Sequence, residues 1–258
     1  MQLTSLFRKD IASIVAVGTE VTTGQIENKH AKFLSEAIDE IGFEVPLHIA
    51  VEDDLEKVMT VLEFVSQWAD DIFVTGGLGP TTDDLTREAI SKWCGLELEF
   101  SPEVWEFIAK RLSARGRERK PIHKKQAHFP VGCRILPNQV GTAHGFVVEK
   151  QVAKGRIIRV WAMPGPTAEL KSIWDPLVVP ELLKRIPENS VELLTWKIQG
   201  LGESEIAERV ERITLGAEVR VGYRLYDGGV ELKLWVPRTN RALLEPIIDE
   251  INKSFLSK

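Results

Sequence analysis

The sequence TGGLGPTTDDLTREA, residues Thr75–Ala89, follows the apolar run Ile72–Val74 and is the main guide to the fold. The apolar run is typical of a buried strand, and the spacing of Leu85 and Ala89 after Asp84 is typical of a helix. The glycines between them allow backbone conformations that other residues avoid, and they let a ligand approach the main chain. Because backbone N–H groups and the dipole of a helix N-terminus favour anions, the stretch predicts a site for phosphate.

The same stretch has an alternative interpretation, in which Thr81 and Asp84 form a capping box and the glycines only make a tight turn. A cap stabilises a helix by about 1 kcal/mol, and it leaves the glycines, Thr82 and Asp83 without a role. Strand ends in α/β sheets commonly hold ligands, and the spacing fits neither a Walker loop nor GxGxxG. We therefore expect a ligand-binding glycine loop made of Thr75, Gly76, Gly77, Leu78, Gly79, Pro80 and Thr81.

Composition limits the class of protein. The 258 residues include 33 Lys and Arg against 38 Asp and Glu, a net charge of −5 that argues against coating nucleic acid or an anionic membrane. The two cysteines, Cys94 and Cys133, form no CxxC pair, so we expect neither a zinc site nor a disulfide framework, as is usual in the cytoplasm. The apolar run Ile11–Val17 is too short to cross a membrane and is interpreted as a buried first strand.

Strands and helices alternate through the first part of the chain. The strand Ile11–Val17 opens into a polar loop, and a helix that ends near Gly42 follows it. The next strand, Phe43–Val51, contains Pro46 and is expected at a sheet edge or a bulge. Alternation of this kind predicts a parallel, doubly wound sheet, with the loops after its strands at one edge. The residues expected there are Gly18, Thr19, Glu20, Asn28 and Asp53, with Asp53 or Asp54 capping the following helix.

A dense basic run follows a helix that begins at Ser101 and Pro102. It admits two interpretations, a solvated helix end or a clamp for polyphosphate, and the sequence does not decide between them. Two further strands, His144–Val148 and Arg156–Trp161, adjoin turns that contain Gly141, Thr142 and Gly165. The basic residues of the run are Arg111, Arg115, Arg117, Arg119, Lys120, His123, Lys124, Lys125 and His128.

A boundary is expected between residues 182 and 189, which divides the chain into residues 1–187 and 190–258. The second part reads as a strand, a helix at Glu203–Ile213, a strand pair that turns at Asp227–Gly229, and a final helix. Its outer strand is expected at Val230–Val236, where apolar residues alternate. The pattern predicts a small α+β domain.

Four stretches together resemble the CinA (competence/damage-inducible) family. They are TGGLGPTTDDLTREA, VGTEVTTGQIENKHAKFLSEAI, KKQAHFPVGCRILPNQVGTAHGF and GLGESEIAERV. The resemblance implies a MoaB/Mog-like α/β/α sandwich with a mostly parallel sheet, followed by a small α+β domain. It also implies cation-assisted hydrolysis of ADP-ribose to AMP and ribose 5-phosphate, in a homo-oligomer that is a dimer or trimer. From the resemblance we expect these 258 residues to correspond to the family's first two domains and not to its C-terminal deamidase domain. The alternative functions are molybdopterin binding or adenylyl transfer, or a non-catalytic nucleotide-binding scaffold.

The acidic residues of the central stretch suggest a role for a cation. Asp83 and Asp84 would repel a phosphate on the same helix end by about 4 kcal/mol per charge pair at 4 Å and an effective dielectric constant near 20. A divalent cation such as Mg²⁺, with a monovalent cation as a further option, would remove the conflict. We expect Asp84, Asp53 and Glu20 as catalytic residues and Asp84 and Asp83 as metal ligands. Lys125 and Gln126 are expected to hold phosphate.

Overall fold

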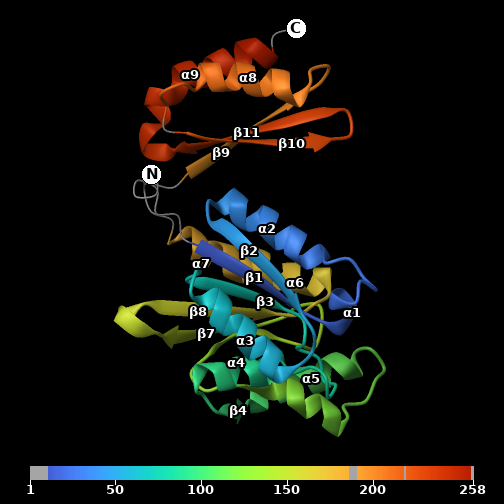
Figure 1. The fold of residues 1–258 in the computed structure, drawn as a ribbon. Coiled ribbons are helices and arrows are strands. Elements are labelled where there is room, and N and C mark those ends of the chain that lie inside the picture. Colours follow the sequence, from blue (N-terminus) through green and yellow to red (C-terminus); the bar gives the residue numbers. More distant parts are fainter. Residues whose placement is uncertain (1–10, 186–190, 218, 257–258) are drawn as a thin grey trace. The chain divides into compact units, whose positions relative to one another are not determined.

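A computed structural model describes residues 11–185, 191–217 and 219–256. These residues fall into two compact units, one that ends at Arg185 and one that contains the residues from 191 onward (Figure 1). Each unit has its own hydrophobic core, and each is described by itself. Within the described residues no helix is long and apolar enough to cross a membrane.

The first unit is built on a six-stranded mixed sheet. Its order is β2 (Glu44–Val51), β1 (Ile11–Val17), β3 (Asp71–Thr75), β8 (Ile157–Met163), β7 (Gly145–Gln151) and β6 (Arg134–Leu136). The pairs from β2 to β8 are parallel, whereas β7 and β6 join antiparallel. The predicted α/β fold with a mostly parallel sheet is therefore confirmed. The helices are α1 (Thr19–Thr22), α2 (Lys29–Ile41), α3 (Leu55–Ser66), α4 (Thr86–Cys94), α5 (Pro102–Ser113), α6 (Thr167–Ile173) and α7 (Val179–Leu183).

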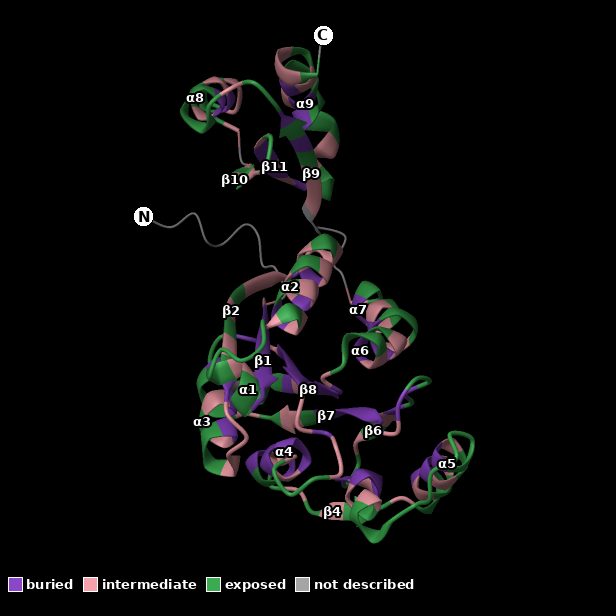
Figure 2. Cartoon of the chain, turned by 90° about the vertical axis from the view of Figure 1, so that its right-hand side faces the viewer, coloured by how far each residue is buried: buried purple, intermediate pink, exposed green. Residues whose placement is uncertain are grey.

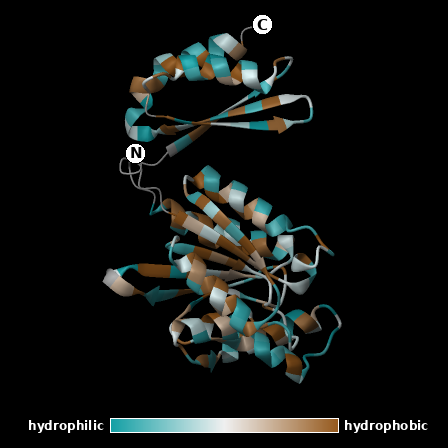
Figure 3. Ribbon diagram, in the orientation of Figure 1, coloured by the Kyte–Doolittle hydropathy of each residue, from teal (hydrophilic) through white to brown (hydrophobic). Residues whose placement is uncertain are grey.

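Helices cover both faces of this sheet. Alternate side chains of each strand point to opposite faces, and because both faces are apolar, both have to be buried. Val15 and Val74 pack in one core with residues of α3, α4 and α5. Phe73, between such positions, instead contacts Trp161 and Trp174, with ring centroids 6.1 and 5.4 Å apart. Figure 2 shows α2, α6 and α7 on one side of the strands and α3 and α4 on the other. Figure 3 shows that the strands between them carry the most hydrophobic residues.

The structure confirms one local prediction, decides between two cap residues and corrects the start of a helix. The strand that contains Pro46 is the edge strand β2, and its register with β1 shifts between Ile11 and Ser13, as the proline predicts. Asp54, not Asp53, caps α3 by accepting the amide of Lys57 at 2.9 Å. Helix α4 begins at Thr86, two residues later than its expected start, because Asp84 is engaged in another contact that is described below.

A smaller sheet and a short turn of 3₁₀ helix complete the first unit. β4 (Leu98–Phe100) pairs antiparallel with β5 (His128–Pro130). The segment Pro121–Ala127, which carries much of the basic run, forms the 3₁₀ helix that precedes β5. A π-helical turn, Trp174–Val178, joins α6 to α7.

The second unit is a three-stranded antiparallel sheet with two helices. Its elements are β9 (Val191–Ile198), α8 (Glu203–Ile213), β10 (Arg220–Tyr226), β11 (Gly229–Pro237) and α9 (Arg241–Phe255), in the sheet order β10–β11–β9. The strand expected on the outside, Val230–Val236, is the central one, because it pairs with β10 on one side and β9 on the other. Its alternating apolar residues are buried against α8 and α9, as the pattern predicts.

Candidate functional site

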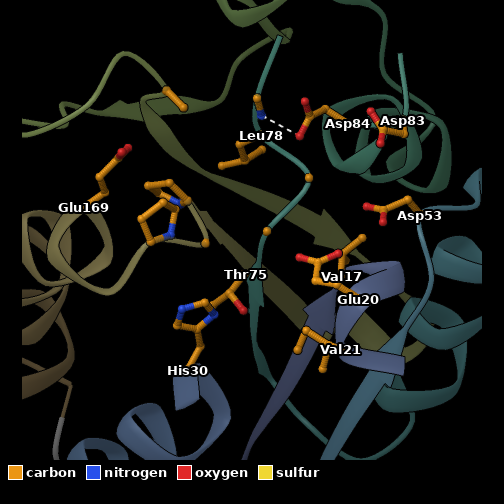
Figure 4. A pocket seen from close by; sticks show the side chains of 18 of the residues that line it. Val17, Glu20, Val21, His30, Asp53, Thr75, Leu78, Asp83, Asp84 and Glu169 are labelled. Carbon is orange, nitrogen blue, oxygen red and sulfur yellow. Dashed lines mark hydrogen bonds between the residues drawn. The ribbon is translucent and has the colours of Figure 1, made fainter. Parts of the chain in front are cut away.

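A cavity of about 410 Å³ lies where β1, β3 and β8 end, at one edge of the first unit's sheet (Figure 4). Parallel strands bring their carboxyl ends to one edge, and ligands of open α/β sheets bind there. The volume falls within the range of small-molecule sites, which is roughly 300–1,000 Å³. The lining residues are Ala16, Val17, Glu20, Val21, Ile26, His30, Asp53, Thr75, Gly76, Gly77, Leu78, Gly79, Pro80, Asp83, Asp84, Gln126, Thr142, Ala143, Pro164, Gly165, Pro166 and Glu169.

The glycine loop needs its first two glycines because the backbone there is tightly packed. Gly76 and Gly77 have φ angles of +93° and +63°, which L-residues with side chains rarely adopt. A Cβ on Gly76 would overlap the carbonyl oxygen of Val17, and one on Gly77 would overlap the hydroxyl of Thr86. The loop therefore fits between the end of β1 and the start of α4 only as bare backbone.

Contacts with α4 orient the carbonyl groups of the loop. The Thr86 hydroxyl donates to Gly76 O at 2.9 Å, and the Thr86 amide donates to Gly77 O at 3.2 Å. The guanidinium of Arg87 donates to Leu78 O at 2.7 Å. In a trans peptide the N–H points opposite to the C=O, so the amides of Gly77, Leu78 and Gly79 point away from α4.

Two of those amides are available to a ligand. The Gly79 amide donates to Asp84 Oδ1 at 2.8 Å, and the Gly76 amide donates to Met163 O at 3.1 Å. Between them, the amides of Gly77 and Leu78 donate to no residue in the described ranges. Adjacent free amides in a loop that lines a cavity are suited to binding an anion.

Asp84 holds the glycine loop and does not cap α4. Its Oδ1 accepts the Gly79 amide, and its Oδ2 accepts both the amide (2.8 Å) and the hydroxyl of Thr81. The N-cap position of α4 belongs to Leu85, which follows. The capping-box interpretation is therefore wrong, although the residue's role in the structure is still to accept backbone N–H groups (Figure 4).

Asp53 connects the loop after β2 to the loop after β1. Its Oδ2 accepts the amide of Thr19 at 2.7 Å and the Thr19 hydroxyl at 3.0 Å. Figure 4 shows Glu20, Asp53 and Asp83 on one side of the glycine loop and Glu169 on the other. The predicted proximity of these loops follows from the parallel pairing of β2, β1 and β3.

The wall on the other side of the cavity is organised by Asn138, a residue that the sequence did not single out. Asn138 is fully buried, and its Oδ1 accepts the amides of Val140 and Gly141 at 2.8 and 2.9 Å. Its Nδ2 donates to Glu169 Oε2 at 2.7 Å. A Cβ on Gly141 would overlap that carboxylate, so this glycine permits the approach of Glu169. Glu169 lies in the first turn of α6 and lines the cavity.

Several residues of the basic run make contacts within the first unit. Arg111 and Arg115 donate to the carbonyls of Gln139 and Val140, and so hold the loop that contains Gly141. Lys125 Nζ donates to Thr81 O at 3.0 Å and lies 3.3 Å from Glu88. None of these side chains lines the cavity, which contains no Lys or Arg among its described lining residues. The contacts favour a structural role over a polyphosphate clamp.

The cavity is acidic, and the pKa of His30, which lines it, is lowered. Its lining includes the carboxylates of Glu20, Asp53, Asp83, Asp84 and Glu169. Burial lowers the pKa of His30, with Glu20 acting in the opposite direction.

Behind the loop of Gly141, burial together with Arg87 and Arg111 lowers the pKa of His144 to about 4. His144 Nδ1 accepts a hydrogen bond from the backbone N–H of Asn138 at 3.1 Å, which places the ring proton on Nε2.

The carboxylates that line the cavity are suitable ligands for a hard cation, but they do not come together around one point. In the described ranges no three His, Cys, Asp or Glu side chains form a group that could hold a metal ion. Both oxygens of Asp84, a predicted metal ligand, already accept hydrogen bonds. A cation in this cavity would therefore need oxygens of the ligand to complete its coordination.

Most of the predicted site residues meet in the cavity. Those that line it are Glu20, Asp53, Thr75, Gly76, Gly77, Leu78, Gly79, Pro80, Asp83, Asp84, Gln126, Thr142 and Gly165. Those that do not are Gly18, Thr19, Asn28, Thr81, Lys125 and Gly141, each of which is hydrogen-bonded to another residue of the first unit.

Asn28, for example, caps α2 by accepting the amide of Ala31 at 3.0 Å, and this brings His30 to the cavity. The lining residues that the sequence did not predict are Ala16, Val17, Val21, Ile26, His30, Ala143, Pro164, Pro166 and Glu169.

Residues 13–184 match the family described as a probable molybdopterin binding domain. The chain belongs to this family. It is 36% identical over 240 residues to a putative competence-damage inducible protein of Caldanaerobacter subterraneus. This match covers 93% of the chain and 57% of that protein. It is 35% identical over 245 residues to a CinA-like protein of Deinococcus radiodurans, covering 93% of the chain and 60% of that protein.

These relatives confirm the resemblance to the CinA family, and the chain spans less than two thirds of their length. A crystal structure of the protein CinA from Thermoplasma acidophilum, of unknown function, is similar with a TM-score of 0.60 and 28% identity. That similarity covers 67% of this chain and 98% of the other.

Proposed function

We propose that the first unit binds a phosphorylated heterocycle of the molybdopterin type, with its phosphate on the glycine loop. The free amides of Gly77 and Leu78 carry the proposal, since they are paired with no described residue and belong to a loop that lines the cavity. The family's description supports a pterin as the heterocycle. Apolar lining residues suited to a ring system are Val21, Ile26, Pro164 and Pro166.

The acidic lining suggests that the phosphate enters together with a cation. Five carboxylates and no Lys or Arg line the described cavity. A phosphate charge 4 Å from one carboxylate is disfavoured by about 4 kcal/mol at an effective dielectric constant near 20. Mg²⁺ bound to the ligand's own oxygens and to one carboxylate, such as Asp53 or Asp83, would offset this repulsion.

The same carboxylates support a second candidate, hydrolysis of the pyrophosphate of ADP-ribose. Cleavage of this bond requires neutralised phosphate oxygens and an oriented water. In this proposal the loop amides and a cation hold the oxygens, and Glu20 or Asp53 orients the water from the same side of the loop. The resemblance to the CinA family suggests this activity.

Titration of the full chain with molybdopterin and with ADP-ribose, each with and without Mg²⁺, tests the proposals. Tight binding of molybdopterin without turnover supports a pterin-binding domain, and adenylylation of the pterin when ATP is added supports a transferase. Release of AMP from ADP-ribose supports the second candidate. Failure of both ligands to bind at millimolar concentration would overturn both.

A further inference from the structure

Arg87, near the start of α4, is a fully buried cation without a carboxylate partner. Its side chain has no exposed area, and one of its amino groups donates to Leu78 O. Its Nε and Nη1 atoms, both buried, have no hydrogen-bond partner among the described residues. No carboxylate oxygen in the described part of the chain lies within 4.0 Å of its guanidinium.

An unpaired buried charge destabilises a folded protein unless something compensates it. The Phe129 ring, 5.8 Å from the guanidinium carbon, offsets part of the lost hydration. Burial lowers the pKa of Arg87 to about 10, while Glu88 and Asp84 act in the opposite direction, so the group stays charged at neutral pH. The structure thus keeps a positive charge directly behind the glycine loop, although the cavity itself is lined only by acidic and neutral side chains.

The peptide groups of the loop lie between this charge and the cavity. The carbonyls of Gly76, Gly77 and Leu78 are all bound by Thr86 and Arg87, at 2.9, 3.2 and 2.7 Å. The carbonyl ends of these dipoles therefore face α4, and the N–H ends face away from it. Arg87 binds only the last of these carbonyls, and its charge on the carbonyl side of the loop adds to the field of the peptide dipoles, which favours an anion at their N–H ends.

We propose that Arg87 is a positioning residue for the phosphate of the ligand, which it serves from behind the loop without touching it. It holds the Leu78 carbonyl, whose peptide N–H is the Gly79 amide that donates to Asp84. Its charge acts through space on an anion bound at the neighbouring free amides of Gly77 and Leu78. This inference rests on the proposed function, since it requires a phosphorylated ligand. It also explains why the buried charge is kept, because the bound anion supplies the missing counter-charge.

The test compares the full chain with Arg87→Met, a neutral side chain of similar length, in titrations with two matched ligand pairs in the presence of Mg²⁺. The pairs are AMP with adenosine, and a pterin phosphomonoester with the same pterin lacking phosphate. We expect Arg87→Met to weaken binding of the phosphorylated member at least tenfold and to change binding of the other less than twofold. A merely structural role would weaken both members equally, and that result would overturn the inference.

Arg87→Lys keeps the charge and a donor, so it should retain most of the preference for phosphate, and it provides the comparison if Arg87→Met does not fold. Loss of the preference in a folded Arg87→Lys protein with parental binding of the unphosphorylated ligand would also overturn the inference. If the parent prefers the phosphorylated ligand and Arg87→Met keeps that preference, only the role of Arg87 is wrong. If the parent shows no preference in either pair, the proposed function is wrong and the inference falls with it.

Discussion

Single residues decide whether the glycine loop keeps its shape, and Asp84 is the first of them. In Asp84→Asn one carboxylate oxygen becomes an NH₂ group, which would face either the Gly79 amide or the Thr81 amide, both of them donors. An unpaired donor of this kind costs about 1–3 kcal/mol, so we expect a lower free energy of unfolding and at least tenfold weaker binding of a phosphorylated ligand. Urea unfolding and ligand titration provide the measurements.

Asp83→Asn is the matched control, because it removes the same charge from the same cavity lining and leaves the bonds from Asp84 to Gly79 and Thr81 intact. It should change the unfolding free energy by less than about 0.5 kcal/mol, as exposed substitutions usually do. Equal losses of stability in the two variants would contradict the loop-holding role of Asp84.

Gly77→Ala tests the close packing between the loop and α4. A left-handed φ angle costs a residue with a side chain about 1–2 kcal/mol, and here the new Cβ would also overlap the Thr86 hydroxyl. Gly116→Ala is the control, since Gly116 has a φ angle of +67° and open space around its Cβ position. We expect Gly77→Ala to lose at least about 1 kcal/mol more than Gly116→Ala in chemical unfolding. Similar losses would show that the overlap is relieved.

The lowered pKa of His144 predicts that the protein loses stability in mild acid. Its pKa in the folded protein is about 4, below the ordinary value of 6.5, so the unfolded chain takes up a proton first as pH falls. The stability from neutral His144 is complete above pH 6.5 and is lost as pH falls from 6.5 towards 4. By linkage the loss is about 2 kcal/mol between pH 7 and pH 5.

The measurement for His144 is the unfolding free energy at pH 7 and pH 5 in the parent and in His144→Gln. The glutamine does not titrate, and its side-chain oxygen can still accept the Asn138 amide. The parent should lose more stability than the variant over this range. Identical pH dependence in both would place the acid sensitivity elsewhere, for example at His30, whose pKa is also lowered.

At the scale of elements, the sequence predicted strands and helices well where periodicity reports burial. β1 and α8 have the predicted bounds, and Gly42 ends α2 as its position suggests. The start of α4 was misplaced because a carboxylate that binds loop amides and one that caps a helix look the same in sequence. Central and outer strands also share a pattern, because a half-buried strand alternates wherever it lies in the sheet, so β11 was assigned to the edge.

The sequence predicted the part of the candidate site that lies on loops after parallel strands, and it missed the opposite wall. The parallel sheet places the loops after β1, β2 and β3 together, and so brings Glu20, Asp53 and the glycine loop to one cavity. Glu169 and Asn138 were missed because their contact depends on a close approach at Gly141, which no local spacing reports.

Strand β3 is joined to the end of the first unit by a buried ion pair, and this predicts a specific loss of stability. Asp71 is fully buried and accepts Trp161 Nε1 at 2.8 Å and two nitrogens of Arg185 at 2.8 and 2.6 Å. Asp71→Ala would leave these donors without their carboxylate, and breaking a buried pair costs about 3–5 kcal/mol. We expect a loss near the lower end of that range, since Arg185 is 23% exposed.

Trp161→Phe is the comparison for this pair, because it removes one hydrogen bond to Asp71 and leaves the contact with Arg185 in place. Its loss of unfolding free energy should be clearly smaller than that of Asp71→Ala. A loss as large would mean that packing of the indole, and not the ion pair, dominates at this position.

At the scale of the whole molecule, oligomerisation remains a proposal that the resemblance to the CinA family suggests. Among the described strands of the first unit, the eight-residue β2 lies at an edge of the sheet. Phe64 of α3 is 47% exposed, and Trp68, two residues after the end of α3, is 56% exposed. Unpaired edges and exposed aromatic residues are typical of contacts between chains. Light scattering at micromolar concentration should give a mass of two or three chains, and a mass near 29.0 kDa would refute the proposal.

The two units should fold independently, because their hydrophobic cores share no residue. The buried hydrophobic residues of the first unit lie between Ala12 and Leu182, and those of the second unit lie between Trp196 and Ile251. A chain shortened to residues 1–189 keeps the Asp71–Arg185 pair and all the lining of the cavity. We expect it to unfold cooperatively and to bind phosphorylated ligands with a Kd within about threefold of that of the full chain, while residues 190–258 should unfold in a separate transition.

Loss of the cooperative transition in the shortened chain would show that the second unit stabilises the first. Normal unfolding with lost binding would instead assign the second unit a part in ligand binding, which no residue of the described cavity suggests.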